Sequence, residues 1–235
     1  MSDVTIVLVH GAFAESASWA GVIPPLVSAG HHVIAAPNEL RSLSGDSSSV
    51  SSLIRSIEGP VVLAGHAYGG SVITNAARGH GNVRALVYVS GFAPAEGESV
   101  ADVQGPGSGS TLGETLVAVP LADGSSDLSI RVDRFHEQFA ADLTAEEAAL
   151  LAATQRPVRD VVLTERSGVP AWQSVPSWFL LAGSDRNIPV EVQRFMAERA
   201  APKSVVEIEA ASHAVIVSHP TEVAELILTA VAATA

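Results

Sequence analysis

Short apolar runs alternate along the chain with segments in which apolar residues recur at helical spacing. The first run, at residues 4–9, is almost continuously apolar, which is typical of a strand covered on both faces of a sheet. Similar runs predict five more strands, at residues 32–36, 60–64, 83–89, 177–182 and 204–208. Strands that alternate with helices indicate βαβ units. We therefore predict an α/β fold with a roughly six-stranded, mostly parallel sheet and helices on both faces.

The helical segments lie between these runs. Apolar residues at positions 19, 22, 23, 26 and 27 share one helix face, and Gly30 stands where that helix would end. Asp46 is placed to cap the next helix, which carries an apolar face from Val50 onward. Further helices are expected at residues 71–78 and 191–200, and an amphipathic helix is expected to close the chain.

Residues 92–172 interrupt this alternation. They begin with FAPAEGES and continue into QGPGSGSTLG, whose glycines and serines predict a mobile stretch. A helix is expected at residues 132–139, and Thr144 and Glu147 have the spacing of a capping box at the start of another. An insertion of this size between two core strands is expected to form a helical lid over the strand ends. We place it within a single domain that spans residues 1–235.

Composition and charge narrow the classes of function. The chain is 47% hydrophobic and 16% charged, which provides enough apolar surface for one large core. Its net charge of −12 disfavours a nucleic acid or an anionic membrane as partner. The absence of cysteine excludes disulfides, thiolate metal sites and a cysteine nucleophile. No signal peptide or membrane-spanning run is recognised, so a cytoplasmic protein is expected.

The strongest chemical signal is the segment GHAYG at residues 65–69, which directly follows a predicted strand and precedes a predicted helix. In that context it has the form of a nucleophile elbow, in which small residues allow a sharp strand-to-helix turn. The central side chain of such an elbow is held at the helix N-terminus, where developing negative charge is favoured. Ala67 occupies the position at which this motif carries serine.

The loop after the first strand, His10-Gly11-Ala12-Phe13, can bring a backbone N–H towards this elbow. We expect an oxyanion hole made of the N–H groups of Tyr68 and Ala12, with Phe13 as the close alternative to Ala12. Gly11 would let the chain turn close to the substrate. His10 is interpreted as a structural prop for the loop.

Two titratable residues complete the constellation. Asp185 comes just after the strand at residues 177–182, and His213 comes just after the last strand. In such a site the histidine takes the proton of the nucleophile and returns it to the leaving group, while the aspartate fixes the tautomer of the histidine. Phe13, Phe92 and His136 are the candidate substrate contacts. No residues have metal-ligand spacing, and no phosphate-binding or dinucleotide motif is found, so neither metal nor cofactor is expected.

These segments resemble small bacterial α/β hydrolases of the serine esterase type, in the branch that includes plant methyl-ester hydrolases and hydroxynitrile lyases. The likeness is carried by VTIVLVHGAFAESASWAGVIPPLVSAGHHVIAAP, LAGHAYGGSVI, LVYVSGFAPAEGES, PSWFLLAGSDRNIP and ASHAVIVSHP, and it is weakest from about residue 103 to 135. The resemblance implies the α/β-hydrolase fold with a helical lid, a serine triad, an oxyanion hole from Ala12 and Tyr68, and no cofactor. Family members would carry serine where this chain has Ala67.

Alanine cannot form an acyl-enzyme, so Ala67 decides the functional prediction. We interpret the parent protein as a serine hydrolase that cleaves a carboxylic ester or lactone, inactivated here by a serine-to-alanine change. His213 and Asp185 favour this hypothesis, because both are retained although a folded core needs neither. The alternatives are a naturally non-hydrolytic relative that binds small ligands, and a lyase or cofactor-free oxygenase in which His213 acts as base.

The predicted partner is a small, uncharged, fairly hydrophobic ester or lactone. It follows from the apolar strand ends and from the aromatic residues of the expected lid. The sequence pattern indicates neither the identity of the substrate nor an oligomeric state.

Overall fold

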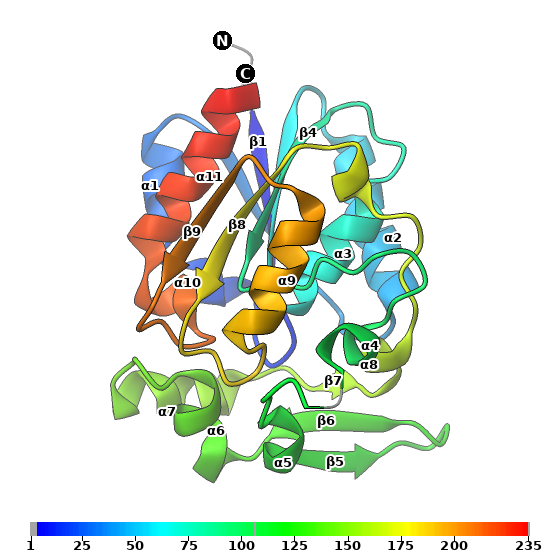
Figure 1. The fold of residues 1–235 in the computed structure, drawn as a ribbon, viewed down its shortest axis with the longest axis vertical. Coiled ribbons are helices and arrows are strands. Elements are labelled where there is room, and N and C mark those ends of the chain that lie inside the picture. The colour runs from blue at the N-terminus through cyan, green and yellow to red at the C-terminus, as the bar shows by residue number, and fades with distance from the viewer. Residues whose placement is uncertain (1–3, 106, 235) are drawn as a thin grey trace.

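The computed structural model describes residues 4–105 and 107–234. Its core is a six-stranded sheet in the order β2-β1-β3-β4-β8-β9, in which every neighbouring pair is parallel (Figure 1). The strands are β1 (Thr5–Val9), β2 (His32–Ala36), β3 (Val61–His66), β4 (Val83–Val89), β8 (Ser177–Ala182) and β9 (Ser204–Ile208). The six predicted strands are therefore confirmed, with shifts of one or two residues at β1 and β3.

Helices cover both faces of this sheet, and the side chains of its strands are therefore buried on both sides. Alternate residues of β1 show this: Ile6 and Leu8 belong to one apolar core, and Val7 and Val9 belong to the other. The first core lies under α1 (Ile23–Ser28) and α11 (Pro220–Thr234). The second lies under α2 (Leu43–Ser56), α3 (Tyr68–Ala76) and α9 (Val190–Ala200).

Three helices differ in their bounds from the sequence prediction. The helix expected at residues 71–78 is α3, which begins three residues earlier, at Tyr68. The N-cap of α2 is Ser42, whose Oγ accepts a hydrogen bond from the Gly45 N–H at 3.1 Å. The prediction that Asp46 caps this helix is wrong: Asp46 lies within the helix, is buried, and accepts a hydrogen bond from the Tyr68 hydroxyl at 2.9 Å. The first predicted helix is split into η1 (Ser16–Trp19) and α1, which begins next to a Pro-Pro pair because proline fits only the first turn of a helix.

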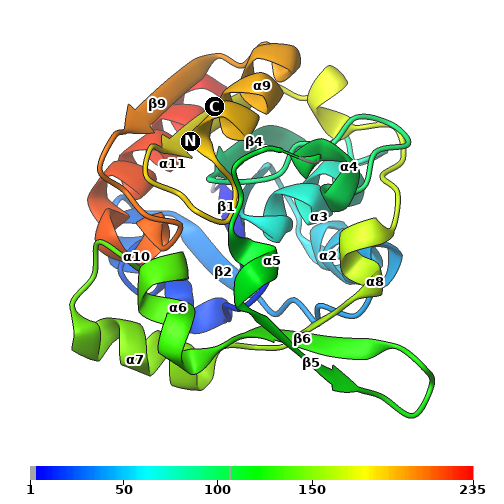
Figure 2. The same cartoon turned by 60° about the horizontal axis from the view of Figure 1, so that its bottom comes forward.

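Most of the segment between β4 and β8 lies beyond the carboxyl ends of the sheet strands (Figures 1 and 2). Its last part, coloured yellow in Figure 1, returns alongside the sheet to the start of β8. Its helices are α4 (Val100–Gln104), α5 (Leu112–Thr115), α6 (Val132–Phe139), α7 (Ala145–Thr154), α8 (Val161–Thr164) and η2 (Ala171–Gln173). The helix at residues 132–139 and the capping box of Thr144 and Glu147 are confirmed. That this segment acts as a lid stays a prediction.

A small antiparallel sheet in the same segment was not predicted. It has the order β5-β6-β7 and consists of β5 (Leu116–Pro120), β6 (Ser126–Ile130) and β7 (Val158–Arg159). β5 is largely exposed, so its sequence lacks the alternation that half-buried strands show. The last short helix, α10 (Val215–Ser218), follows β9. Across the described part of the chain, no helix has the length and hydropathy needed to cross a membrane.

Candidate active site

β3 passes into α3 through a single residue, Ala67. Its backbone has φ +50° and ψ −121°, a conformation that costs a non-glycine residue about 1–3 kcal/mol. Backbone hydrogen bonds hold it on both sides: its N–H donates to the Val89 carbonyl at 3.3 Å, and its carbonyl accepts from the N–H groups of Gly70 and Phe92 at 3.0 Å each. The end of β4 and the residues that follow it thus help to hold the strained turn between β3 and α3.

The turn fits because three nearby residues, Gly65, Gly69 and Gly70, have no side chain. A Cβ on Gly65 would lie 2.5 Å from the carbonyl oxygen of Gly69. A Cβ on Gly69 would overlap the carbonyl oxygen of Val9, and a Cβ on Gly70 would overlap that of Phe92. The obstacles are backbone atoms of packed strands and loops, which cannot rotate away. The glycines of GHAYGG therefore allow the backbones of β1, β3, α3 and the segment after β4 to approach closely.

Residues 11–13 lie directly against this turn. A Cβ on Gly11 would lie 2.5 Å from Ala67 Cβ and 3.2 Å from the backbone nitrogen of Tyr68. Tyr68 is the first residue of α3, where a backbone N–H has no intrahelical acceptor. Ala12, Phe13 and Tyr68 line the same cavity. The structure therefore brings together the three residues whose N–H groups were expected to form an oxyanion hole.

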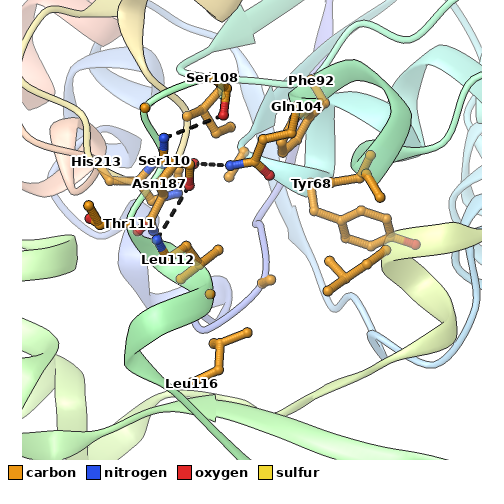
Figure 3. Close-up of a pocket in the computed structure, with 18 of the residues that line it drawn as sticks. Tyr68, Phe92, Gln104, Ser108, Ser110, Thr111, Leu112, Leu116, Asn187 and His213 are labelled. Carbon is orange, nitrogen blue, oxygen red and sulfur yellow. Dashed lines mark hydrogen bonds between the residues drawn. The ribbon is translucent and has the colours of Figure 1, made fainter. Parts of the chain in front are cut away.

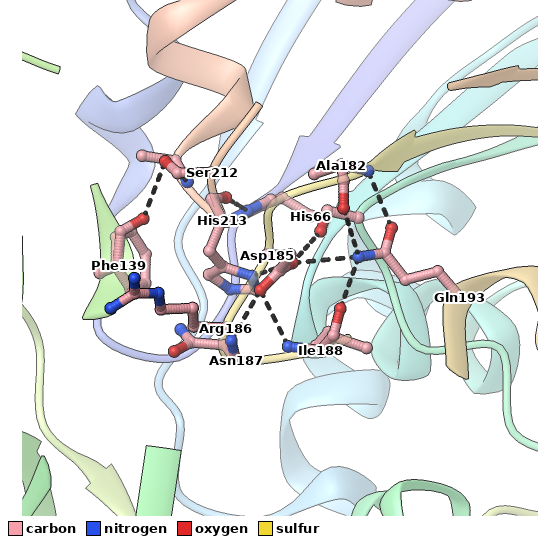
Figure 4. A network of polar contacts seen from close by, with 12 residues as sticks. His66, Phe139, Ala182, Asp185, Arg186, Asn187, Ile188, Gln193, Ser212 and His213 are labelled. Carbon is pink, nitrogen blue, oxygen red and sulfur yellow. Dashed lines mark hydrogen bonds and ion pairs between the residues drawn. The ribbon is translucent and has the colours of Figure 1, made fainter. Parts of the chain in front are cut away.

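Asp185 and His213 lie side by side in the loops that follow β8 and β9 (Figure 4). His213 Nδ1 is 2.7 Å from Asp185 Oδ2, and both side chains are almost completely buried. Four further donors reach this carboxylate: Ser90 Oγ at 2.5 Å and Gln193 Nε2 at 3.1 Å on Oδ2, and the N–H groups of Asn187 at 2.7 Å and Ile188 at 2.9 Å on Oδ1. They fix the carboxylate in one orientation, with Oδ2 towards the imidazole.

Sequence reasoning missed two of these donors, Ser90 and Gln193. Ser90 directly follows a predicted strand, at the same edge of the sheet as Asp185. This position in the sequence could have indicated that the two side chains meet. Gln193 lies on α9, where its amide also donates to the Ile188 carbonyl at 2.6 Å and accepts from the Ala182 N–H at 3.1 Å. A glutamine on a predicted helix is expected to face solvent, so nothing in the sequence indicated this buried role.

His66, the residue before Ala67, contacts His213 from the strand side. Its Nε2–H donates to the His213 carbonyl at 2.9 Å, and the centroids of the two rings are 4.9 Å apart. Burial lowers the pKa of the His66 imidazole well below its ordinary value, and the neighbouring His213 lowers it further. A neutral His66 therefore links the end of β3 to the loop that carries His213.

A cavity of about 680 Å³ lies beside these residues (Figure 3). Ala67 and His213 both line it. Its apolar wall consists of Ala12, Phe13, Tyr68, Phe92, Val100, Ala101, Leu112, Leu116, Leu163 and Ile188. Among the described lining residues, Glu114 alone carries a formal charge. The arrangement suits an uncharged, largely apolar ligand whose polar group lies next to His213.

The expected substrate contacts separate into two groups. Phe13 and Phe92 line the cavity. His136 is not among its lining residues: it is exposed, and its Nε2 lies 2.9 Å from the Leu143 carbonyl oxygen. The interpretation of His136 as a ligand contact is therefore not retained, because α6 turns Phe135 and Gln138, not His136, towards the protein interior. Over residues 4–105 and 107–234, no group of three or more His, Asp or Glu side chains is arranged to hold a metal ion.

His10 has the structural role that was predicted for it. Its Nε2 accepts a hydrogen bond from the Asn38 N–H at 3.0 Å, and its Nδ1 lies 2.9 Å from the Gly11 carbonyl oxygen. An imidazole that accepts at Nε2 must be unprotonated there. Burial lowers the pKa of His10 from 6.5 to about 4, in agreement with these contacts.

His10 is expected to make the fold sensitive to acid. Because its folded pKa lies below its unfolded pKa, its contribution to stability is complete above about pH 6.5 and is lost as the pH falls towards 4. Between pH 7 and pH 5 this loss is about 2 kcal/mol. Urea unfolding at both pH values should show a smaller decrease in the free energy of unfolding for His10→Gln than for the present chain. The exposed His32→Gln variant is the control; an equal decrease in the two variants would contradict the assignment.

Comparisons with known proteins identify the family of the chain. A profile of the alpha/beta hydrolase family matches residues 6–226. The chain belongs to this family. Among curated alpha/beta hydrolase relatives, it is 29% identical to a pyrethroid hydrolase of Sphingobium wenxiniae over 250 residues, covering 97% of the chain and 87% of the relative. It is also 35% identical to a carbendazim hydrolyzing esterase of a Nocardioides species over 107 residues, covering 40% of the chain and 44% of that relative.

Solved structures confirm the α/β-hydrolase fold. Tomato methylketone synthase I complexed with 2-tridecanone superposes with a TM-score of 0.84 at 20% identity, with all of both chains covered. A pyrethroid hydrolase of Sphingobium faniae superposes with a TM-score of 0.80 at 25% identity, with 96% of each chain covered. Polyneuridine aldehyde esterase gives a TM-score of 0.81 at 21% identity, with 97% of this chain and 98% of that chain covered. These superpositions show the fold, and the two sequence relatives above are named as a hydrolase and an esterase.

Proposed function

We propose that this site is that of an ester or lactone hydrolase whose nucleophile has been replaced by alanine. The observation that carries the proposal is the buried His213–Asp185 pair on the cavity that Ala67 also lines. Apolar residues would pack this position at least as well as a buried histidine and aspartate with four additional donors. Packing alone therefore does not explain the pair. They are the parts that a serine at position 67 would need.

The proposed chemistry follows the roles of a serine triad. With serine at position 67, the Nε2 of His213 would accept the hydroxyl proton while Asp185 holds Nδ1. The N–H of Tyr68, with that of Ala12 or Phe13, would stabilise the oxyanion. The serine would form an acyl-enzyme and release the alcohol, and water would then release the acid with His213 as base. With Ala67, the covalent step is impossible, and this chain would bind the ester without forming an acyl-enzyme.

The cavity supports a small, uncharged, fairly hydrophobic ester or lactone as the ligand. Its wall is apolar, and its described lining contains no Lys or Arg to pair with an anion. The names of the sequence relatives, a pyrethroid hydrolase and a carbendazim hydrolyzing esterase, support hydrolysis as the reaction of the parent. The segment at residues 92–172, which includes the lining residues from Val100 to Leu163, would then serve as the lid.

Ester binding without turnover is the test for this chain as it stands. 4-Nitrophenyl butyrate should bind saturably, shift amide resonances around Ala67 and His213, and be recovered intact. Its hydrolysis should be no faster than with the His213→Ala variant, because no acyl-enzyme forms. Phe92→Arg, which places a charge on the apolar wall, should weaken binding by about tenfold or more. A chain that does not bind the ester at all would contradict the proposal.

A second candidate uses His213 as a base on a carbon acid, as in a lyase or a cofactor-free oxygenase. It is favoured by Ala67 itself, which removes the nucleophile and leaves the base, and by the superposition on methylketone synthase I with its bound 2-tridecanone. It ranks second because the relatives found by sequence are named as a hydrolase and an esterase.

Hydrogen exchange on a ketone separates the two candidates. With His213 as base, the present chain should catalyse incorporation of deuterium from D₂O next to the carbonyl of 2-tridecanone, and His213→Ala should abolish it. Oxygen uptake with the same ketone tests the oxygenase form. If neither reaction exceeds the rate without protein, this candidate is excluded.

A further inference from the structure

A buried glutamine joins three separate parts of the chain next to the His213–Asp185 pair. Gln138 lies on α6 and is only 4% exposed. Its Nε2 donates to Asn187 Oδ1 at 2.8 Å and to the Arg186 carbonyl at 3.0 Å. Its Oε1 accepts from Thr111 Oγ1 at 2.8 Å. One amide therefore ties α6 to the loop that carries Asp185 and to the glycine- and serine-rich segment before α5.

That segment, residues 107–112, forms one side of the cavity, and we refer to it as the roof. The roof is fastened to the same loop at other points (Figure 3). The Thr111 N–H donates to the Arg186 carbonyl at 3.2 Å, and Ser110 Oγ donates to the Asn187 carbonyl at 2.9 Å. Gln104, just before the roof, donates to the Asn187 carbonyl at 2.5 Å. The predicted mobile stretch is thus held on Arg186 and Asn187.

Asn187 connects the roof to the carboxylate. Its carbonyl accepts from the roof, its side chain accepts from Gln138, and its own N–H donates to Asp185 Oδ1 at 2.7 Å. Asp185 in turn holds His213 Nδ1 through its other oxygen. A continuous chain of hydrogen bonds therefore runs from the cavity roof to the imidazole. Gln138, Asn187, Asp185 and His213 are buried, whereas the roof residues Ser110 and Thr111 are half-buried. A buried polar group that loses its partner has no water to replace it, so a displacement at Gln138 is passed on towards His213.

We propose that Gln138 is a positioning residue that couples the cavity roof to the orientation of Asp185 and His213. When the roof lies closed on the Asp185 loop, Gln138 holds Asn187 in the position at which the Asn187 N–H orients the carboxylate. When the roof moves away, Gln138 loses Thr111, and the loop at residues 186–188 loosens with it. This inference rests on the proposed roles of Asp185 and His213, and it adds that a ligand which closes the roof also aligns the base.

Amide hydrogen exchange on the present chain tests the coupling without any catalysis. The reporters are the Thr111 N–H in the roof and the N–H groups of Asn187 and Ile188, which donate to Asp185. Gln138→Met keeps the side-chain length and removes all three hydrogen bonds, so exchange at all three reporters should accelerate by about tenfold. Thr111→Val removes only the hydrogen bond between the roof and Gln138. The coupling predicts that it too accelerates exchange at Asn187 and Ile188, by less than Gln138→Met.

Gln155 provides a matched control. It lies between the same two strands as Gln138, and its amide also makes three hydrogen bonds, to the Ile130 N–H and to the carbonyls of Ile130 and Ala152. None of the hydrogen bonds of its side chain in the described structure reaches the loop at residues 185–188. Gln155→Met should leave exchange at Asn187 and Ile188 unchanged. If Gln138→Met does not fold, Asn187→Leu removes the same contact from the opposite side and should accelerate the Ile188 N–H.

One spectroscopic and one kinetic measurement complete the test. The downfield Nδ1 proton of His213 should broaden in Gln138→Met through faster exchange with water, and stay sharp in Gln155→Met. In an Ala67→Ser background, Gln138→Met should lower kcat about tenfold with little change in KM, since the base is misaligned while the cavity wall is retained. Gln155→Met should not change kcat.

The outcomes for the two proposals are distinguishable. If Ala67→Ser hydrolyses no ester, the proposed function fails, but exchange and the His213 resonance still decide the coupling. If a folded Gln138→Met shows unchanged exchange at Asn187 and Ile188, Gln138 is only a packing contact of α6 and the coupling is overturned. Equal acceleration in Gln138→Met and Gln155→Met would also overturn it, because loosening of the whole segment would then explain the effect.

Discussion

Replacing Ala67 with serine is expected to raise the rate of hydrolysis of 4-nitrophenyl butyrate by about a thousandfold. Alanine already adopts the strained backbone conformation of this turn, so the added hydroxyl should not change the fold. Removing the nucleophile of a serine enzyme costs on the order of 10⁶ in kcat, and a site that retains its base and its oxyanion donors should recover a large part of this factor. A burst of 4-nitrophenolate in stopped-flow absorbance would show the acyl-enzyme directly.

The double variant Ala67→Ser, His213→Ala is the control for this gain. It keeps the hydroxyl and removes the base, so the burst should disappear and the rate should return to that of the present chain. KM should change little between the single and the double variant, because the apolar wall contains neither substitution. A folded Ala67→Ser protein without turnover on a panel of esters and lactones would contradict the proposed function.

Replacing Gly69 with alanine is expected to destabilise the protein by at least about 3 kcal/mol. The new Cβ would overlap the carbonyl oxygen of Val9 and come within 2.9 Å of the His10 carbonyl oxygen. Relief would require β1 and the first turn of α3 to separate, which would open the core on one face of the sheet and displace Ala12 from Tyr68. Urea unfolding monitored by circular dichroism would measure the loss, and an insoluble variant would agree with it.

Gly81→Ala is the matched control for this prediction. Gly81 is exposed, and a Cβ there would meet no atom within 4 Å. Its free energy of unfolding should stay within about 0.5 kcal/mol of that of the present chain. If Gly69→Ala were as stable as Gly81→Ala, the close approach of β1 to the elbow would not be the reason for glycine at position 69.

The sequence was sufficient for the sheet because buried parallel strands carry a strong local signal. Runs such as residues 83–89 and 177–182 are apolar on both faces, and the structure reproduces their bounds. The order of Ala67, Asp185 and His213 along the chain also had a spatial meaning, since parallel strands bring their carboxyl ends to one edge of the sheet. Local pattern and topology thus predicted which residues meet.

The segment between β4 and β8 was predicted less well. Its hairpin β5–β6 is exposed along one strand, and its helices α4 and α5 have only 5 and 4 residues, too few to show a periodic apolar face. The glycine- and serine-rich roof was expected to be mobile on composition. In the folded chain it is hydrogen-bonded to Arg186 and Asn187, which follow it by about 75 residues. Contacts of that separation have no local signature.

By itself, the sequence determined the α/β class, the six strands of the main sheet, the elbow with its alanine, and the candidates Asp185, His213, Ala12 and Tyr68. These features follow from periodicity and from residue types next to strand ends, which are local properties of the chain. Only the tertiary structure decided that Ser90 and Gln193 hold Asp185, that His136 faces solvent, and that Gln138 joins α6, the roof and the Asp185 loop. The physical reason is that each of these side chains acts through a partner on another element, and burial, which makes such a hydrogen bond costly to lose, exists only once the elements have packed.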